Sequence, residues 1–204
     1  MLYRLSPSYC RSSLRRLGGD FPHPIAEDKA LKTLLPGANL VRLVMNHWHD
    51  TTQPSDCGTQ QGPHYLTEEC LEQFDRTLAW STGELGAWSI ITARSAQAAG
   101  DGGPGKTIFT NTTLKGQWLA MWGSLAKRYA TTDNIAGYEV MSEPRTNVNT
   151  SYVHQLQQEA CDAIWAADPK AACLIGPAKF YNRYHLSPEY LLTGGPAIYA
   201  ANFL

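Results

Sequence analysis

The chain has 204 residues, of which 43% are hydrophobic and 17% are charged, and its formal net charge is -1. This length suffices for one well-buried domain. The balanced charge gives no reason to expect nucleic acid or an anionic membrane surface as a partner. No apolar run approaches the roughly 18 residues of a membrane-spanning helix, so we expect a soluble protein.

The first 24 residues form a segment for which the sequence predicts no definite structure. Residues 1–19 contain four arginines, four serines and no acidic residue, a composition that resembles an organelle transit peptide. The arginines interrupt any apolar core of a signal peptide. We favour a truncated or misannotated start, and we expect one domain over residues 25–204.

Helical and strand-like segments alternate along the rest of the chain, which predicts a parallel sheet covered by helices. This pattern fits an open doubly wound sheet or part of an eight-stranded barrel. No glycine motif of a nucleotide-binding site follows a strand with the right spacing, which weakens the open-sheet interpretation. The predicted helices are 27–37, 66–80, 114–130, 151–169 and 187–194, and the predicted strands are 39–45, 87–93, 137–145, 172–177 and 197–204.

Two helices carry clear local signals. Thr67 is a predicted N-cap for the helix over 66–80. In the helix over 114–130, Trp118, Met121, Trp122 and their neighbours share one face. Such a stripe is far more often core than cofactor contact, so we predict that it is buried.

The stretch GYEVMSEPR, residues 137–145, reads as a strand that ends in a glutamate, Glu143, directly before a proline. Strand alternation predicts Glu139, Met141 and Glu143 on one face and Ser142 on the other. Glu143 then stands at the carboxyl end of the strand, where parallel α/β folds place their chemistry. A buried Arg42 on the earlier strand needs an acidic partner, either Glu139 or a catalytic carboxylate. Arg42 and its acidic partner could belong to a functional site or form a purely structural ion pair, and the sequence favours neither interpretation.

The segment WLAMWGSLAKRYATTDNIAGYEVMSEPR, residues 118–145, resembles the region around the fourth strand of glycoside hydrolase family 5, the cellulase-type enzymes. The strands that start at residues 39, 87, 172 and 197 resemble the second, third, fifth and sixth strands in order. The resemblance covers about residues 25–204. It implies a partial (β/α)8 TIM barrel that hydrolyses O-glycosidic bonds in a β-linked, cellulose-like polysaccharide.

The resemblance assigns roles to individual residues. Glu143 matches the general acid/base, and Arg42 matches the arginine that supports the catalytic carboxylates. Ser142 replaces the usual asparagine that binds the sugar 2-hydroxyl. Arg94 ends the third strand where the family has an Asp-x-His element, and Asn202 begins the tripeptide that replaces His-x-Tyr on the sixth.

Trp48 is a further candidate substrate-binding residue, because an aromatic side chain in a loop at the strand ends can stack on a sugar ring. The substitutions at the third, fourth and sixth strands indicate a divergent branch of the family. The resemblance implies an oligosaccharide or polysaccharide substrate, no cofactor, and a monomer at full length.

The resemblance also implies a missing catalytic group. Retaining glycosidases need two carboxyl groups about 5–5.5 Å apart, and the family's nucleophile is a glutamate at the end of the seventh strand. The chain ends inside what resembles the sixth strand. We therefore expect a fragment that lacks the nucleophile and is inactive alone.

Two other functions are open. The protein could be a non-catalytic carbohydrate-binding relative of the same fold, as the substituted Ser142, Arg94 and Asn202 suggest. His47, His49 and Asp50 form an HxHD cluster that could hold a metal, but such residues at a strand exit are usually ordinary loop residues. We expect no metal site.

The cysteines and glycosylation sequons bear on the compartment. Cys57 and Cys70 could form a disulfide, although buried free thiols are as good an interpretation. The sequons at Asn111 and Asn149 slightly favour secretion. We expect a secreted protein.

Overall fold

A computed structural model describes residues 2–5, 33, 37, 39–45, 66–93, 108–142, 144 and 149–201. These residues contain one sheet of six strands in the order β1-β2-β3-β4-β5-β6, and every neighbouring pair is parallel. The strands are β1 (Leu2–Leu5), β2 (Leu40–Met45), β3 (Trp88–Ala93), β4 (Ile135–Glu139), β5 (Cys173–Ile175) and β6 (Ala197–Tyr199).

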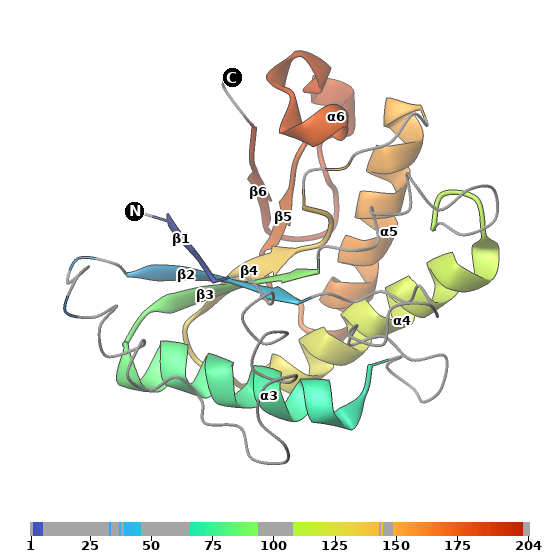
Figure 1. Ribbon diagram of the computed structural model, residues 1–204. Helices are drawn as coiled ribbons and strands as arrows, with labels where there is room; N and C mark the ends of the chain where they lie inside the picture. Colours follow the sequence, from blue (N-terminus) through green and yellow to red (C-terminus); the bar gives the residue numbers. More distant parts are fainter. Residues whose placement is uncertain are drawn as a thin grey trace, which may run out of the picture.

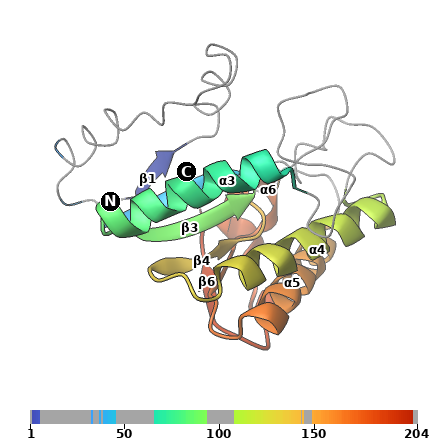
Figure 2. The same ribbon diagram turned by 90° about the horizontal axis from the view of Figure 1, so that it is seen from below.

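The helices that connect β2 to β5 lie outside the sheet, with α4 (Thr112–Tyr129) and α5 (Thr150–Ala167) side by side (Figures 1 and 2). Sequential parallel strands joined by outer helices are the arrangement of a (β/α)8 barrel. The predicted partial barrel is therefore confirmed. The helices are α3 (Glu68–Ala79), extended by a π-helical turn at Trp80–Glu84, then α4 (Thr112–Tyr129), α5 (Thr150–Ala167) and the short α6 (Ala178–Tyr181), with 3-10 turns at Arg183–His185 and Pro188–Tyr190.

Polar side chains cap the three long helices. The Thr67 hydroxyl accepts a hydrogen bond from the Cys70 amide at 3.3 Å, which confirms the predicted cap of α3. Asn111 Oδ1 accepts from the Leu114 amide at 3.1 Å at the start of α4. Asn149 caps α5 in the same way. Each cap satisfies an amide that has no partner inside its helix, and so fixes where the helix begins.

The core lies between the helices and the sheet. Trp118, Met121 and Trp122 of α4 have no exposed surface, so the predicted burial of this stripe is confirmed. The Trp122 ring meets Tyr138 of β4 edge-on, with ring centroids 6.2 Å apart. Tyr138 thus faces α4, and the next residue of β4, Glu139, points to the opposite, inner face of the sheet.

The structure differs from the sequence prediction in several elements, and β5 and β6 are shorter than predicted, ending at Ile175 and Tyr199. Strand β1 was not predicted, and neither was α6. Strand β4 begins two residues earlier than expected and ends at Glu139. The predicted helix over 187–194 is only a 3-10 turn at Pro188–Tyr190. The predicted helix over 27–37 and residues 202–204 of the predicted last strand lie outside the described residues, except for residues 33 and 37.

Candidate active site

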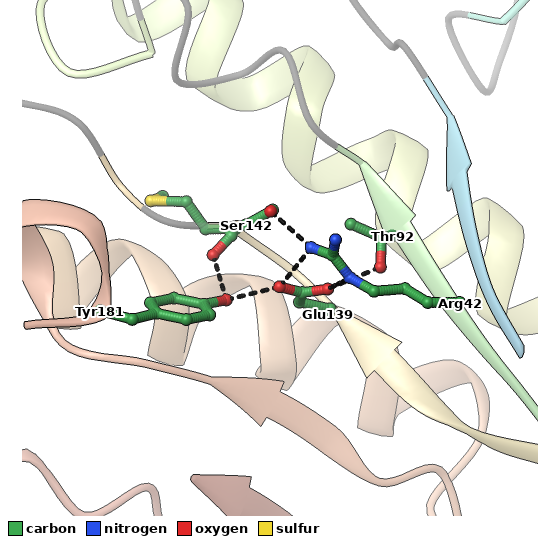
Figure 3. A network of polar contacts seen from close by, with 6 residues as sticks. Arg42, Thr92, Glu139, Ser142 and Tyr181 are labelled. Atoms are coloured by element: carbon green, nitrogen blue, oxygen red, sulfur yellow. Dashed lines mark hydrogen bonds and ion pairs between the residues drawn. The ribbon is translucent and has the colours of Figure 1, made fainter. Parts of the chain in front are cut away.

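A buried ion pair joins β2 and β4 on the inner face of the sheet (Figure 3). Arg42 is 9% exposed and Glu139 is 2% exposed. Nε of Arg42 donates to Oε2 of Glu139, and Nη2 donates to Oε1 at 2.7 Å. This two-point contact satisfies both charges in a buried position, which an unpaired arginine could not occupy. Glu139, one of the two partners predicted for Arg42, is therefore a partner of it, while Glu143 lies outside the described residues.

Two further hydroxyl groups complete the shell of Glu139. Strand β3 lies between β2 and β4, and its Thr92, in register with Glu139, donates to Oε2 at 2.7 Å. Tyr181, at the end of α6, donates to Oε1 at 2.8 Å. The carboxylate thus accepts two bonds from Arg42 and one from each hydroxyl, which matches the about four lone-pair sites of a carboxylate. Glu139 therefore holds Arg42, Thr92 and Tyr181 in place, and it has no lone pair left to accept a hydrogen bond from a substrate.

Ser142 lies on the same side as Glu139, so the prediction that it faces the opposite side was wrong. Its Oγ accepts a hydrogen bond from Nη2 of Arg42, the nitrogen that also contacts Glu139. The physical reason is the early end of β4. The chain bends at residues 140–142, and strand alternation holds only while the backbone stays extended.

Tyr181 is a site residue that the sequence analysis missed. Its φ angle is 58° and that of Lys179 is 55°, in the left-handed region that costs about 1–3 kcal/mol for residues other than glycine. The hydroxyl donates to Glu139 and also to the Met141 carbonyl at 2.7 Å. The dipeptide Gly176-Pro177 after the fifth strand signals a turn, but nothing local indicates which of the following aromatic residues turns inward.

The structure brings together Arg42 and Ser142 of the predicted site. The predicted acid/base Glu143 lies outside the described residues, as do the candidate substrate-binding residues Trp48, Arg94 and Asn202. The HxHD cluster at residues 47–50 lies outside them too. Among the residues that are described, no group of three or more His, Cys, Asp or Glu side chains could hold a metal ion.

The three cysteines that the structure describes are in two states. Cys70 is disulfide-bonded, and its partner lies outside the described residues, as does the predicted partner Cys57. Cys161 and Cys173 are free and buried. Within the described ranges, no helix has both the length and the apolar character to cross a membrane.

Comparisons with known proteins agree with this architecture. An endoglucanase from the hyperthermophilic Thermotoga maritima superposes with a TM-score of 0.68 at 18% identity, covering 86% of this chain and 52% of that one. An endoglucanase from Pseudomonas stutzeri gives 0.67 at 22% identity, with 85% and 52% covered. Cellulose synthase subunit Z of Clostridioides difficile gives 0.66 at 16% identity, with 92% and 56% covered.

At these identities the superpositions show the fold alone, and the chain spans about half the length of the solved structures that it matches. No curated protein matches the sequence. The family model described as "Cellulase (glycosyl hydrolase family 5)" matches residues 21–193, which is most of the chain. With its parallel barrel strands and its buried Arg42–Glu139 pair, the chain belongs to glycosyl hydrolase family 5, the cellulase family.

Proposed function

We propose that the full-length protein cleaves β-linked glucans by a retaining double displacement. The observation that carries this proposal is the family match over residues 21–193. The polar network on the inner face, which ends one residue before Glu143, supports it. The Thermotoga maritima relative was solved with cellobiose and with mannotriose, so both β-glucans and mannans are substrates to test.

In this mechanism Glu143 is the general acid/base. It protonates the departing glycosidic oxygen while a second carboxylate attacks the anomeric carbon, and it then deprotonates the hydrolytic water. Glu139 cannot take this part, because its oxygens already accept hydrogen bonds from Arg42, Thr92 and Tyr181. The nucleophile is expected outside residues 1–204.

Ser142 is the proposed contact to the sugar 2-hydroxyl. Its Oγ accepts from Arg42, which leaves the hydroxyl proton for donation to a sugar oxygen. Arg42 supplies a fixed positive charge beside the site. Trp48, Arg94 and Asn202 are proposed as further substrate-binding residues.

The test is reducing-sugar release from a panel of β-glucans and mannans. We expect no release by residues 1–204 and clear release by a version extended through the seventh and eighth strands. In that version Glu143→Gln should lower turnover about 10²–10⁴-fold on substrates with poor leaving groups, because general acid–base help is lost. Substrates with good leaving groups need little protonation, so their first step should suffer less.

Glu189→Gln is the matched control, because Glu189 is exposed in the 3-10 turn at Pro188–Tyr190. It should leave turnover unchanged. An active 204-residue chain, or an extended enzyme that tolerates Glu143→Gln, would show that the acid is wrongly assigned.

The second candidate is a carbohydrate-binding relative without catalysis, which the serine at position 142 favours. It predicts that the extended protein binds the same glycans but releases no reducing sugar.

We also propose that the protein is secreted. Polysaccharides of this class lie outside cells, and the disulfide at Cys70 is typical of oxidising compartments. The sequons at Asn111 and Asn149 are consistent with this location.

A further inference from the structure

We propose that Tyr181 is a positioning residue of the glycan site. It holds the chain immediately after β4 in the one geometry in which Ser142 meets the sugar. This inference rests on the proposed function and deepens it, because it says what fixes the site's shape.

The first observation is where the Tyr181 hydroxyl binds. It lies between Oε1 of Glu139 at 2.8 Å and the Met141 carbonyl at 2.7 Å. One phenol proton serves both acceptors, so the hydroxyl ties the last residue of β4 to the backbone two residues further on. Arg42 approaches Glu139 from the other side and holds Ser142 (Figure 3). The bend over residues 140–142 is therefore held from two sides.

The second observation is how the fold holds Tyr181 in this pose. A Cβ added to Gly176 would lie 2.3 Å from Cδ1 of the Tyr181 ring, so only glycine leaves room for the ring. Gln157 of α5 donates to the Gly176 carbonyl at 2.9 Å. The Tyr181 amide donates to the Pro177 carbonyl at 3.1 Å. The left-handed backbone at Tyr181 persists because these contacts over-determine it.

The consequence concerns ligand binding more than stability. A shift of about 1 Å in a binding group can cost about 100-fold in function, and the Met141–Ser142 peptide is the part that Tyr181 restrains. Loss of the hydroxyl should let this peptide move while Glu139 keeps its contacts with Arg42 and Thr92.

Tyr181→Phe in the full 204-residue chain tests this idea, with Tyr129→Phe as the matched control. Tyr129 also donates to a carboxylate at 2.8 Å, that of Asp75, but on the outer helices. Both variants lose one tyrosine–carboxylate hydrogen bond. Two quantities are measured: amide hydrogen exchange over residues 140–142, and the Kd for cellotetraose by calorimetry.

We expect Tyr181→Phe to accelerate exchange over residues 140–142 and to weaken cellotetraose binding about tenfold, the contribution of about one hydrogen bond to the sugar. Tyr129→Phe should leave both quantities within about twofold, since it lies away from the site. Equal effects of the two variants in the exchange experiment would overturn the proposal, because they would show that Tyr181 contributes only to the overall stability of the fold.

Gly176→Ala is a second variant that keeps the hydroxyl but displaces the ring, and its Cβ would also lie 2.7 Å from the Ala200 carbonyl oxygen. It should reproduce both effects of Tyr181→Phe, whereas Gly83→Ala, with no atom within 4 Å of the added Cβ, should not. If the unaltered 204-residue chain binds no glycan, glycan binding by this part of the protein is refuted, while the function of the full-length protein is tested separately by reducing-sugar release. The exchange experiment then decides the role of Tyr181 alone.

Discussion

At the scale of single residues, the Arg42–Glu139 pair illustrates why a buried charge depends on its partner. Both residues are buried, with 9% of Arg42 and 2% of Glu139 exposed, and a buried ion pair gains little over apolar residues of similar size. Removal of one partner, however, leaves the other charge without compensation. The pair thus links β2 to β4, the two strands on either side of β3.

Glu139→Leu should therefore lower the free energy of unfolding by about 3–5 kcal/mol, because Arg42 is left buried and unpaired. The double variant Arg42→Met, Glu139→Leu should be more stable than Glu139→Leu alone. Urea denaturation of four proteins measures this: the unaltered protein, Glu139→Leu, Arg42→Met and the double variant. A double variant whose loss is the sum of the two single losses would contradict the coupling.

His154 is the residue that links stability to pH. It lies on α5 with 6% exposure, its ring stacks on Tyr190 at 3.8 Å, and its Nε2 has no hydrogen-bond partner among the described residues. Burial lowers the pKa of His154 from 6.5 to about 4. The unfolded chain therefore takes up a proton at a higher pH than the folded one. The His154 contribution to stability is complete above pH 6.5 and falls as the pH drops toward 4.

His154→Phe should remove this pH dependence, since phenylalanine keeps a ring on Tyr190 and does not titrate. The gap of about 2.5 pH units, at about 1.4 kcal/mol each, limits the effect to about 3–4 kcal/mol. The free energy of unfolding of both proteins is measured at pH 7.5 and at pH 4.5. Relative to the unaltered protein, the variant should be more stable at pH 4.5 than at pH 7.5. A constant difference at both pH values would refute the assignment.

At the scale of elements, helix α4 depends on its cap as well as on its apolar face. Asn111 Oδ1 accepts hydrogen bonds from the amides of Thr113 and Leu114 at 3.0 and 3.1 Å, and the first turn of α4 contains no acidic residue. The helix then carries Trp118 and Trp122 into the core. A cap that starts the helix at this residue also sets which face those rings occupy.

Asn111→Ala should lower the free energy of unfolding by about 1 kcal/mol, the usual contribution of such a cap. Asn111→Asp is the control, because it keeps the acceptor and adds a favourable negative charge at the helix start. It should be at least as stable as the unaltered protein in thermal unfolding. Equal losses in both variants would show that the side chain matters for another reason.

At the scale of the whole molecule, a disulfide complements the core. Cys70 sits in the first turn of α3 and is disulfide-bonded, whereas Cys161 and Cys173 are free and fully buried. Burial raises the pKa of the Cys161 thiol above its usual range. Cys161 should therefore react slowly with alkylating reagents in the native state.

A reductant should lower the melting temperature on the order of 10 °C, because a disulfide typically contributes about 2–4 kcal/mol. Cys70→Ser should melt at the lower temperature with or without reductant, which separates the disulfide from other effects of the reagent. Scanning calorimetry of both proteins checks this. An unaltered protein indifferent to reductant would contradict it.

Local patterns in the sequence were enough for the alternation of helices and strands, the cap at Thr67, the buried stripe around Trp118, and the family. These depend on periodicity and on neighbours a few residues apart, so they can be read before the chain folds. Only the tertiary structure decided that Arg42 pairs with Glu139, a residue 97 positions away. It also decided that Ser142 turns back to the same side and that Tyr181 joins from beyond β5. Those contacts depend on where strands end and how loops pack, and such choices are made by burial and hydrogen bonding across the whole domain.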